Sequence, residues 1–146
     1  AGLTLPAVNL PRFEAEFARE VERWVDADTL AGHLHSDGEL QAGEFNVTTA
    51  EALRDGGPWG AAFPEPAFDG EFGVIDARVV GQRHLKLRLR SGSGESVEAI
   101  AFRYLDDGQA PEIRANDRVV AVYRTGIDDY SGTRRLQLVT EWVGKA

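Results

Sequence analysis

The sequence contains no cysteine and no methionine, and it has no long apolar run. The absence of cysteine excludes a disulfide scaffold, a thiolate metal site and a cysteine nucleophile. No apolar stretch reaches the roughly 18 residues needed to cross a membrane, so we expect no membrane partner. A coding sequence begins with methionine, and the first residues show no signal-peptide pattern, so we interpret the chain as a piece of a longer protein.

The 146 residues are enough for one or two small domains, and a hydrophobic content of 42% excludes a disordered chain. The net charge of −8 argues, taken alone, against nucleic-acid binding. The charge is unevenly distributed, however. Residues 1–69 carry four basic and thirteen acidic side chains, whereas residues 70–146 carry twelve and eleven. The chain therefore consists of two electrically different pieces.

The first piece has helical patterns. Apolar residues recur every three or four positions over residues 10–25, which predicts an amphipathic helix with Asn9 as its cap. Residues 30–45 fit an irregular strand or two. Thr48 and Glu51 have the spacing of a capping box and predict a second, short helix that ends at the following pair of glycines.

Residues 56–69 (GGPWGAAFPEPAFD) are rich in glycine and proline, which predicts an ordered loop or linker. We expect this segment to divide the chain into domains at residues 1–55 and 70–146. The second domain is then expected to fold on its own.

Beyond residue 70 the hydrophobic period changes to two, and turn residues recur regularly, which is typical of a small all-β module. A long connection over residues 105–117 separates the third and fourth predicted strands. This arrangement favours the OB-fold, a partly open Greek-key barrel, with an SH3-like barrel or a small sandwich as the alternative. The predicted class is α+β, with a helical and strand remnant followed by a five-stranded barrel. The five predicted strands are 72–80, 84–90, 96–104, 118–123 (extending to 127) and 134–142.

The second predicted strand separates apolar from basic residues most clearly. Three leucines occupy one face, and the other face carries a basic stripe of His84, Lys86, Arg88 and Arg90. On an OB-fold, such a stripe is where single-stranded nucleic acid lies, although a solvated strand face gives the same pattern. Further candidate DNA-binding residues are the cations Arg83, Arg103, Arg134 and Arg135 and the rings Tyr104, Tyr123 and Tyr130.

The sequence holds no clear catalytic or metal-binding motif. His33, His35 and Asp37 alternate as zinc ligands on a strand could, but further ligands are not evident and an exposed strand produces the same alternation. We therefore predict no metal site and no catalytic residue from these patterns.

Several short motifs together resemble a known family, the bacterial RecJ exonucleases, over nearly the whole chain. These enzymes degrade single-stranded DNA from 5′ to 3′, and a linker of the form PFG-x-GNPEP joins their DHHA1 domain to an OB-fold. Here the GNPEP part is altered, although its Pro-Glu-Pro core is kept. The motifs are Ala1-Gly2, Gly57-Pro58-Trp59-Gly60, Pro64-Glu65-Pro66-Ala67-Phe68, Arg78-Val79-Val80-Gly81, His84-Leu85-Lys86-Leu87-Arg88-Leu89, Glu98-Ala99-Ile100-Ala101-Phe102 and Leu136-Gln137-Leu138.

The resemblance implies that residues 1–55 end a DHHA1 domain and that residues 70–146 form an OB-fold that binds single-stranded DNA in repair and recombination. The family's catalytic Asp and His residues, which hold two Mn²⁺ or Mg²⁺ ions, lie upstream, so we expect no cofactor in this chain and no cleavage by it alone. We expect a monomer in the bacterial cytoplasm. The alternative is a protein-interaction module that binds an acidic peptide, such as the tail of single-strand-binding protein.

Overall fold

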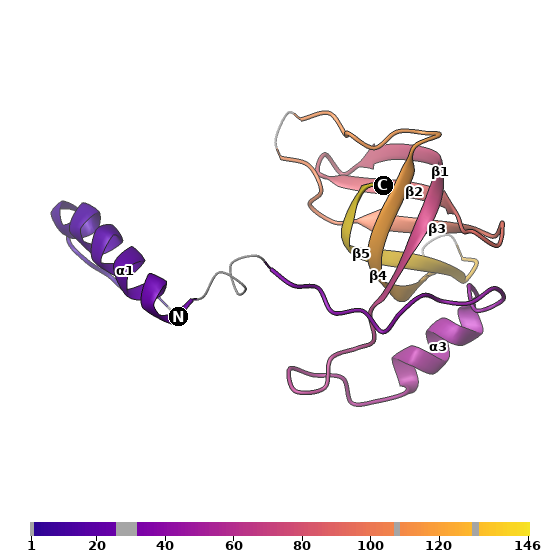
Figure 1. The fold of residues 1–146 in the computed structure, drawn as a ribbon, viewed down its shortest axis with the longest axis horizontal. Helices are drawn as coiled ribbons and strands as arrows, with labels where there is room; N and C mark the ends of the chain where they lie inside the picture. The colour runs from indigo at the N-terminus through magenta and orange to yellow at the C-terminus, as the bar shows by residue number, and fades with distance from the viewer. Residues whose placement is uncertain (1, 26–31, 107–108, 130–131) are drawn as a thin grey trace. The chain divides into compact units, whose positions relative to one another are not determined.

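The computed structural model describes residues 2–25, 32–106, 109–129 and 132–146 (Figure 1). The chain divides into two compact units, Ala1–Leu34 and His35–Ala146. The first unit contains a short 3-10 turn, η1 (Ala7–Asn9), and helix α1 (Leu10–Trp24). The second unit contains helix α3 (Val47–Asp55) and a β-barrel. This larger unit begins well before the predicted linker at residues 56–69.

Both predicted helices are present, and Asn9 occupies the N-cap position of α1 as predicted, but the predicted capping box of the second helix is wrong. Asn9 makes no capping hydrogen bond because it is already helical, with φ −91° and ψ −6° at the end of η1. Helix α3 is capped by Asn46, whose extended backbone lets its side chain accept a hydrogen bond from the Thr49 N–H at 2.9 Å. Thr48 lies inside the helix and so cannot be its cap. Within the described ranges, no helix is long and apolar enough to cross a membrane.

The second unit contains the five strands of a closed barrel in the order β1-β2-β3-β5-β4. Strands β3 and β5 are parallel, and the other neighbours are antiparallel. The predicted α+β class and OB-type barrel are confirmed, but the irregular strand or two predicted over residues 30–45 is wrong, because the described part of this segment (32–45) contains no strand. The predicted third strand was too long, because β3 ends at Ala101, whereas the first strand begins four residues earlier than predicted. The strands are β1 (Phe68–Val80), β2 (His84–Arg90), β3 (Ser96–Ala101), β4 (Arg118–Asp128) and β5 (Arg135–Lys145).

Strand β1 closes the barrel by pairing with two partners. Its first half, Phe68–Gly73, pairs with β4, and its second half, Gly73–Val80, pairs with β2. The register shifts between Val74 and Asp76, where an extra residue interrupts the ladder. Such a bulge bends a strand and increases its twist, which allows one strand to serve both sides of a barrel.

The barrel interior is filled by alternate residues of every strand. Leu85, Leu87 and Leu89 of β2 are buried almost completely, as the period of two predicts. Tyr123 of β4 is also buried, with its ring 5.7 Å from that of Phe72. Burial raises the pKa of the Tyr123 hydroxyl. Tyr123 is therefore a core residue, and its prediction as a stacking ring for DNA is wrong.

Residues 35–67, the segment of the second unit before β1, supply part of the same core. Leu40 and Ala50 belong to the buried cluster of the barrel, and Phe45 packs against the ring of Phe72 at 6.2 Å. Two hydrogen bonds between Asp37 and Ala67 attach this segment to the start of β1: the Asp37 N–H donates to the Ala67 carbonyl at 2.7 Å, and the Asp37 carboxylate accepts from the Ala67 N–H. Helix α3 lies against β4 and β5 and covers one end of the barrel (Figure 1).

Substituting the central leucine of β2 tests the core. We expect Leu87→Ala to lower the free energy of unfolding by about 2 to 5 kcal/mol, because it leaves a cavity in a closed barrel. As a control, Arg90→Ala replaces an exposed residue of the same strand and is expected to change the free energy of unfolding by less than about 0.5 kcal/mol. Chemical denaturation followed by circular dichroism measures both, and equal effects would contradict the assignment of faces.

Two truncated chains test whether the segment before β1 belongs to the barrel. A chain that starts at His35 is expected to unfold cooperatively with nearly the stability of the whole protein. A chain that starts at Ala67 loses Phe45, Leu40 and Ala50, and is expected to be about 3 kcal/mol less stable, since burying one large apolar side chain is worth about 1.5 to 3 kcal/mol. Equal melting temperatures would show that the segment is dispensable.

Candidate nucleic-acid interface

The basic stripe lies on the outer face of β2, as the alternation predicts. His84 and Lys86 are half-buried and Arg88 and Arg90 are exposed. Neighbouring strands extend the stripe sideways: Arg78 of β1 lies opposite Lys86. The sequence pattern does not predict a role for Arg78 in this stripe, because only the strand pairing shows that it shares this face.

Lys86, on the outer face of β2, forms ion pairs with two carboxylates from other strands of the barrel. Its Nζ lies 2.6 Å from the Glu98 carboxylate of β3 and 3.8 Å from that of Asp128, at the end of β4. Only 20% of the Lys86 side chain is exposed. An ammonium group in this position is already neutralised, and it is less available to an external anion than the sequence suggests.

Arg88 and Arg135 remain available in the part of the chain that is described. Arg88 is exposed and donates from Nε to the hydroxyl of Ser96 at 3.2 Å, a neutral partner that leaves the guanidinium charge uncompensated. Arg135 is exposed at the start of β5 and forms no ion pair with a described residue. The other cations of β4 and β5 differ: Arg118, Arg124 and Lys145 each pair with a carboxylate.

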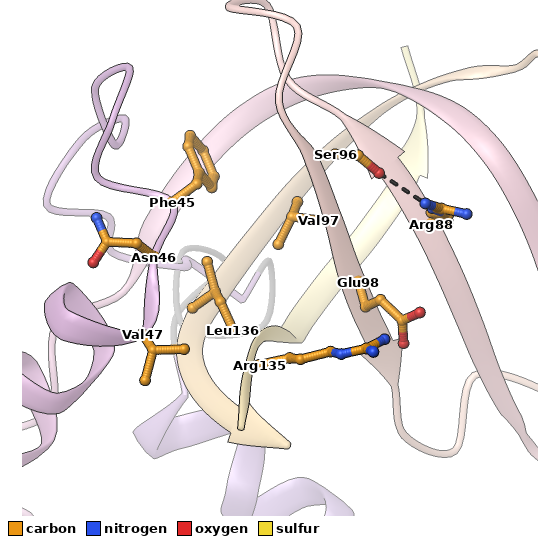
Figure 2. A pocket seen from close by; sticks show the side chains of 9 residues that line it. All are labelled: Phe45, Asn46, Val47, Arg88, Ser96, Val97, Glu98, Arg135 and Leu136. Atoms are coloured by element: carbon orange, nitrogen blue, oxygen red, sulfur yellow. Dashed lines mark hydrogen bonds between the residues drawn. The ribbon is translucent and has the colours of Figure 1, made fainter. Parts of the chain in front are cut away.

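A hollow of about 420 Å³ brings these two arginines together. Figure 2 shows them with Glu98 on one side and an apolar wall on the other. This volume is within the range of small-ligand pockets, about 300 to 1,000 Å³. The hollow combines cations with apolar surface, as a site for an organic anion would. Its lining residues are Phe45, Asn46, Val47, Arg88, Ser96, Val97, Glu98, Arg135 and Leu136.

An exposed ring lies at the other end of the basic stripe. The Phe102 ring is 57% exposed, and its centroid lies 5.2 Å from that of His84. The His84 Nδ1 accepts a hydrogen bond from the Arg103 N–H at 2.9 Å, which fixes the turn in which Arg103 has φ +55°. The sequence analysis selected tyrosines as stacking rings and missed Phe102. The signal was its place directly after an alternating strand, where a large apolar side chain is not required by the core.

The remaining predicted residues are dispersed. Arg134 pairs with Glu51 of α3 at 2.6 Å, which attaches the helix to β5. Arg83 donates from Nε to the Leu105 carbonyl at 3.5 Å, beside the long connection. Tyr104 is half-buried, and burial, followed by the charge of Glu112, raises its pKa. Tyr130 lies outside the described residues.

Of the three candidate zinc ligands, Asp37 has a structural role. Asp37 is engaged with the Ala67 backbone. In the ranges that the structure describes, no three His, Asp or Glu side chains gather as a metal site would require.

Comparison with known proteins agrees with this architecture. A sequence model described as the RecJ OB domain matches residues 36–141. The single-stranded-DNA-specific exonuclease RecJ of Dickeya dadantii is 41% identical over 142 residues, which are 97% of this chain and 24% of that protein. The Escherichia coli protein of the same name is 37% identical with the same coverage. The chain thus spans about a quarter of the length of the curated relatives it matches.

Solved structures show the same fold. The structure of RecJ from Thermus thermophilus with Mn²⁺ matches this chain with a TM-score of 0.66 at 21% identity. The match covers 99% of this chain and 20% of the Thermus thermophilus chain. The Mg²⁺ complex has the same TM-score at 20% identity. The family match begins at residue 36, close to where the larger compact unit begins. The chain therefore belongs to the RecJ family, and residues 36–141 correspond to its OB domain.

Proposed function

We propose that the barrel is the single-stranded-DNA-binding part of a 5′-to-3′ single-strand-specific exonuclease, and that strand cleavage occurs in parts of a longer protein outside this chain. The observation that carries the proposal is the outer face of β2 and β3, where the arginines of β2 lie near an exposed ring, Phe102, that directly follows β3 of an OB-type barrel. In this role the protein acts in DNA repair and recombination in the bacterial cytoplasm.

The chemistry of this face suits an unpaired strand. Arg88 and Arg135, with Arg78 beyond them, supply guanidinium groups for phosphates, and Phe102 offers a ring on which a base stacks. Bases of a duplex already stack and pair with each other, so their faces are not available to Phe102. The combination of cations and a ring therefore favours single strands over duplex.

Among the described residues, the metal ions of the relatives have no donor set. In the longer protein, Mn²⁺ or Mg²⁺ would activate water and stabilise charge on the scissile phosphate. The carboxylates and imidazoles of the described residues do not gather into such a site, so no metal is assigned to them. The role of this chain is to hold the strand.

A second candidate function rests on the hollow. Its apolar wall, formed by Phe45, Val47 and Leu136, lies beside Arg88 and Arg135, and this combination also suits an acidic peptide with an apolar end. An acidic peptide such as the tail of single-strand-binding protein is the alternative ligand named in the sequence analysis. Competition between such a peptide and an oligonucleotide for the chain separates the two functions, since binding of the peptide alone would favour the second.

The proposal is tested by titrating the 146-residue chain into labelled single-stranded and duplex oligonucleotides of about 16 nucleotides, the upper site size of one OB-fold. We expect tighter binding of the single strand and a clear loss of affinity at higher salt. Equal affinity for the duplex, or no binding of either, contradicts the proposed function.

Removing the two available arginines tests the phosphate contacts. The double variant Arg88→Ala with Arg135→Ala is expected to flatten the slope of log K against log salt by about 1.4, since each lost contact to a single strand removes about 0.7. Arg118→Ala is a control for the loss of one surface arginine, because Arg118 pairs with Glu71 away from β2 and β3. A wild-type slope in a folded double variant would mean that DNA binds elsewhere.

Removing the exposed ring tests base stacking. Phe102→Ala is expected to weaken single-strand binding by about 1 to 3 kcal/mol without changing the salt slope, because stacking releases no counterions. Phe63 is a suitable control, since its ring is 54% exposed but stacks on Trp59 outside the strands of the barrel. If Phe63→Ala weakens binding as much, Phe102 is not a specific platform for bases.

A further inference from the structure

Glu98 occupies a central place among the cations of the proposed DNA-binding face. In the register of the sheet, Glu98 of β3 lies directly opposite Arg88 of β2. Its carboxylate holds the Lys86 ammonium at 2.6 Å, and it lines the same hollow as Arg135 (Figure 2). One carboxylate is therefore within the group of three cations that the sequence analysis had assigned to DNA.

A carboxylate in this position resembles the ligand that we propose for the face. Carboxylate and phosphate oxygens accept the same charge-assisted hydrogen bonds from lysine and arginine. The Lys86 side chain is only 20% exposed, so water and salt screen its pair with Glu98 less than they screen a pair at the open surface. Asp128 is the more distant partner, at 3.8 Å. With Glu98 in place, the charge of Lys86 is largely neutralised, and its attraction for a phosphate is reduced.

We propose that Glu98 is an internal competitor of the DNA backbone: its carboxylate competes with DNA phosphates for Lys86. Glu98 thereby keeps Lys86 out of the phosphate contacts and weakens the binding of a single strand to the barrel. This inference rests on the proposed function and assigns a regulating residue to the same site. Weaker binding of the strand has a physical use. A strand that must advance past the barrel as it is shortened needs contacts that release readily, and a lysine already paired with a carboxylate adds no further phosphate contact to break.

The experiment measures the affinity of the whole chain for a labelled oligothymidine of about 16 nucleotides over a range of salt concentrations. Glu98→Gln keeps the size of the side chain and removes its charge. We expect it to tighten binding about fivefold near 0.1 M salt and to steepen the salt slope by about 0.7, which is the effect of one added phosphate contact. Glu98→Thr removes the carboxylate with a residue that favours strands, and it decides the question if the first variant folds poorly.

Two comparisons separate competition from a general change in charge. Glu71→Gln is the matched control: Glu71 also pairs with an arginine, at 2.8 Å, but it lies on the part of β1 that pairs with β4. It changes the net charge by the same amount and is expected to leave the slope unchanged. Lys86→Ala is expected to leave the wild-type slope unchanged, yet to remove the added 0.7 in the Glu98→Gln background.

The outcomes distinguish this inference from the proposed function. If the wild-type chain binds the single strand, and Glu98→Gln behaves as Glu71→Gln does or binds more weakly, the internal competitor is excluded while the proposed function stands. A steeper slope that persists when Lys86 is also removed excludes it as well. If neither the wild-type chain nor the Glu98 variants bind single strands, both proposals fall.

Discussion

The pairing of β1 with both β2 and β4 is the constraint on which the rest of the structure depends. A sheet closed in this way has one inside and one outside, so every alternating strand must place its apolar set inward. For β2 this buries three leucines and commits the residues between them to the surface. A slip of one residue would place the charged side chains in the core, and the register of the basic stripe is therefore strongly determined.

The same closure decides which surface charges are available to a ligand. Side chains that are distant in sequence become cross-strand neighbours, and such neighbours interact directly. Lys86 pairs with Glu98 and is neutralised, whereas Arg88 donates to the hydroxyl of Ser96, forms no ion pair with a described residue and keeps its charge available. Arg135, which follows Arg134 in the chain, faces the hollow, while Arg134 pairs with α3. Basic residues that look equivalent in the sequence thus have different roles.

The acidic segment before β1 belongs with the barrel despite its opposite charge balance. Leu40, Phe45 and Ala50 complete the core at one end, and Glu51 pairs with an arginine of β5. Acidic side chains in this segment serve partly as hydrogen-bond acceptors, as Asp37 does for the start of β1. A change in composition along a chain therefore need not mark a division between compact units, because packing depends on apolar surface that net charge does not report.

The sequence by itself determined the helices, the five strands and the faces of β2, because local periodicity and turn residues depend only on neighbours along the chain. It also indicated the family. Tertiary structure alone decided the rest: the burial of Tyr123, the exposure of Phe102, and the neutralisation of Lys86 by Glu98. These features depend on which strands become neighbours and at what register, and a period of two cannot distinguish an available cation from one that already faces a carboxylate.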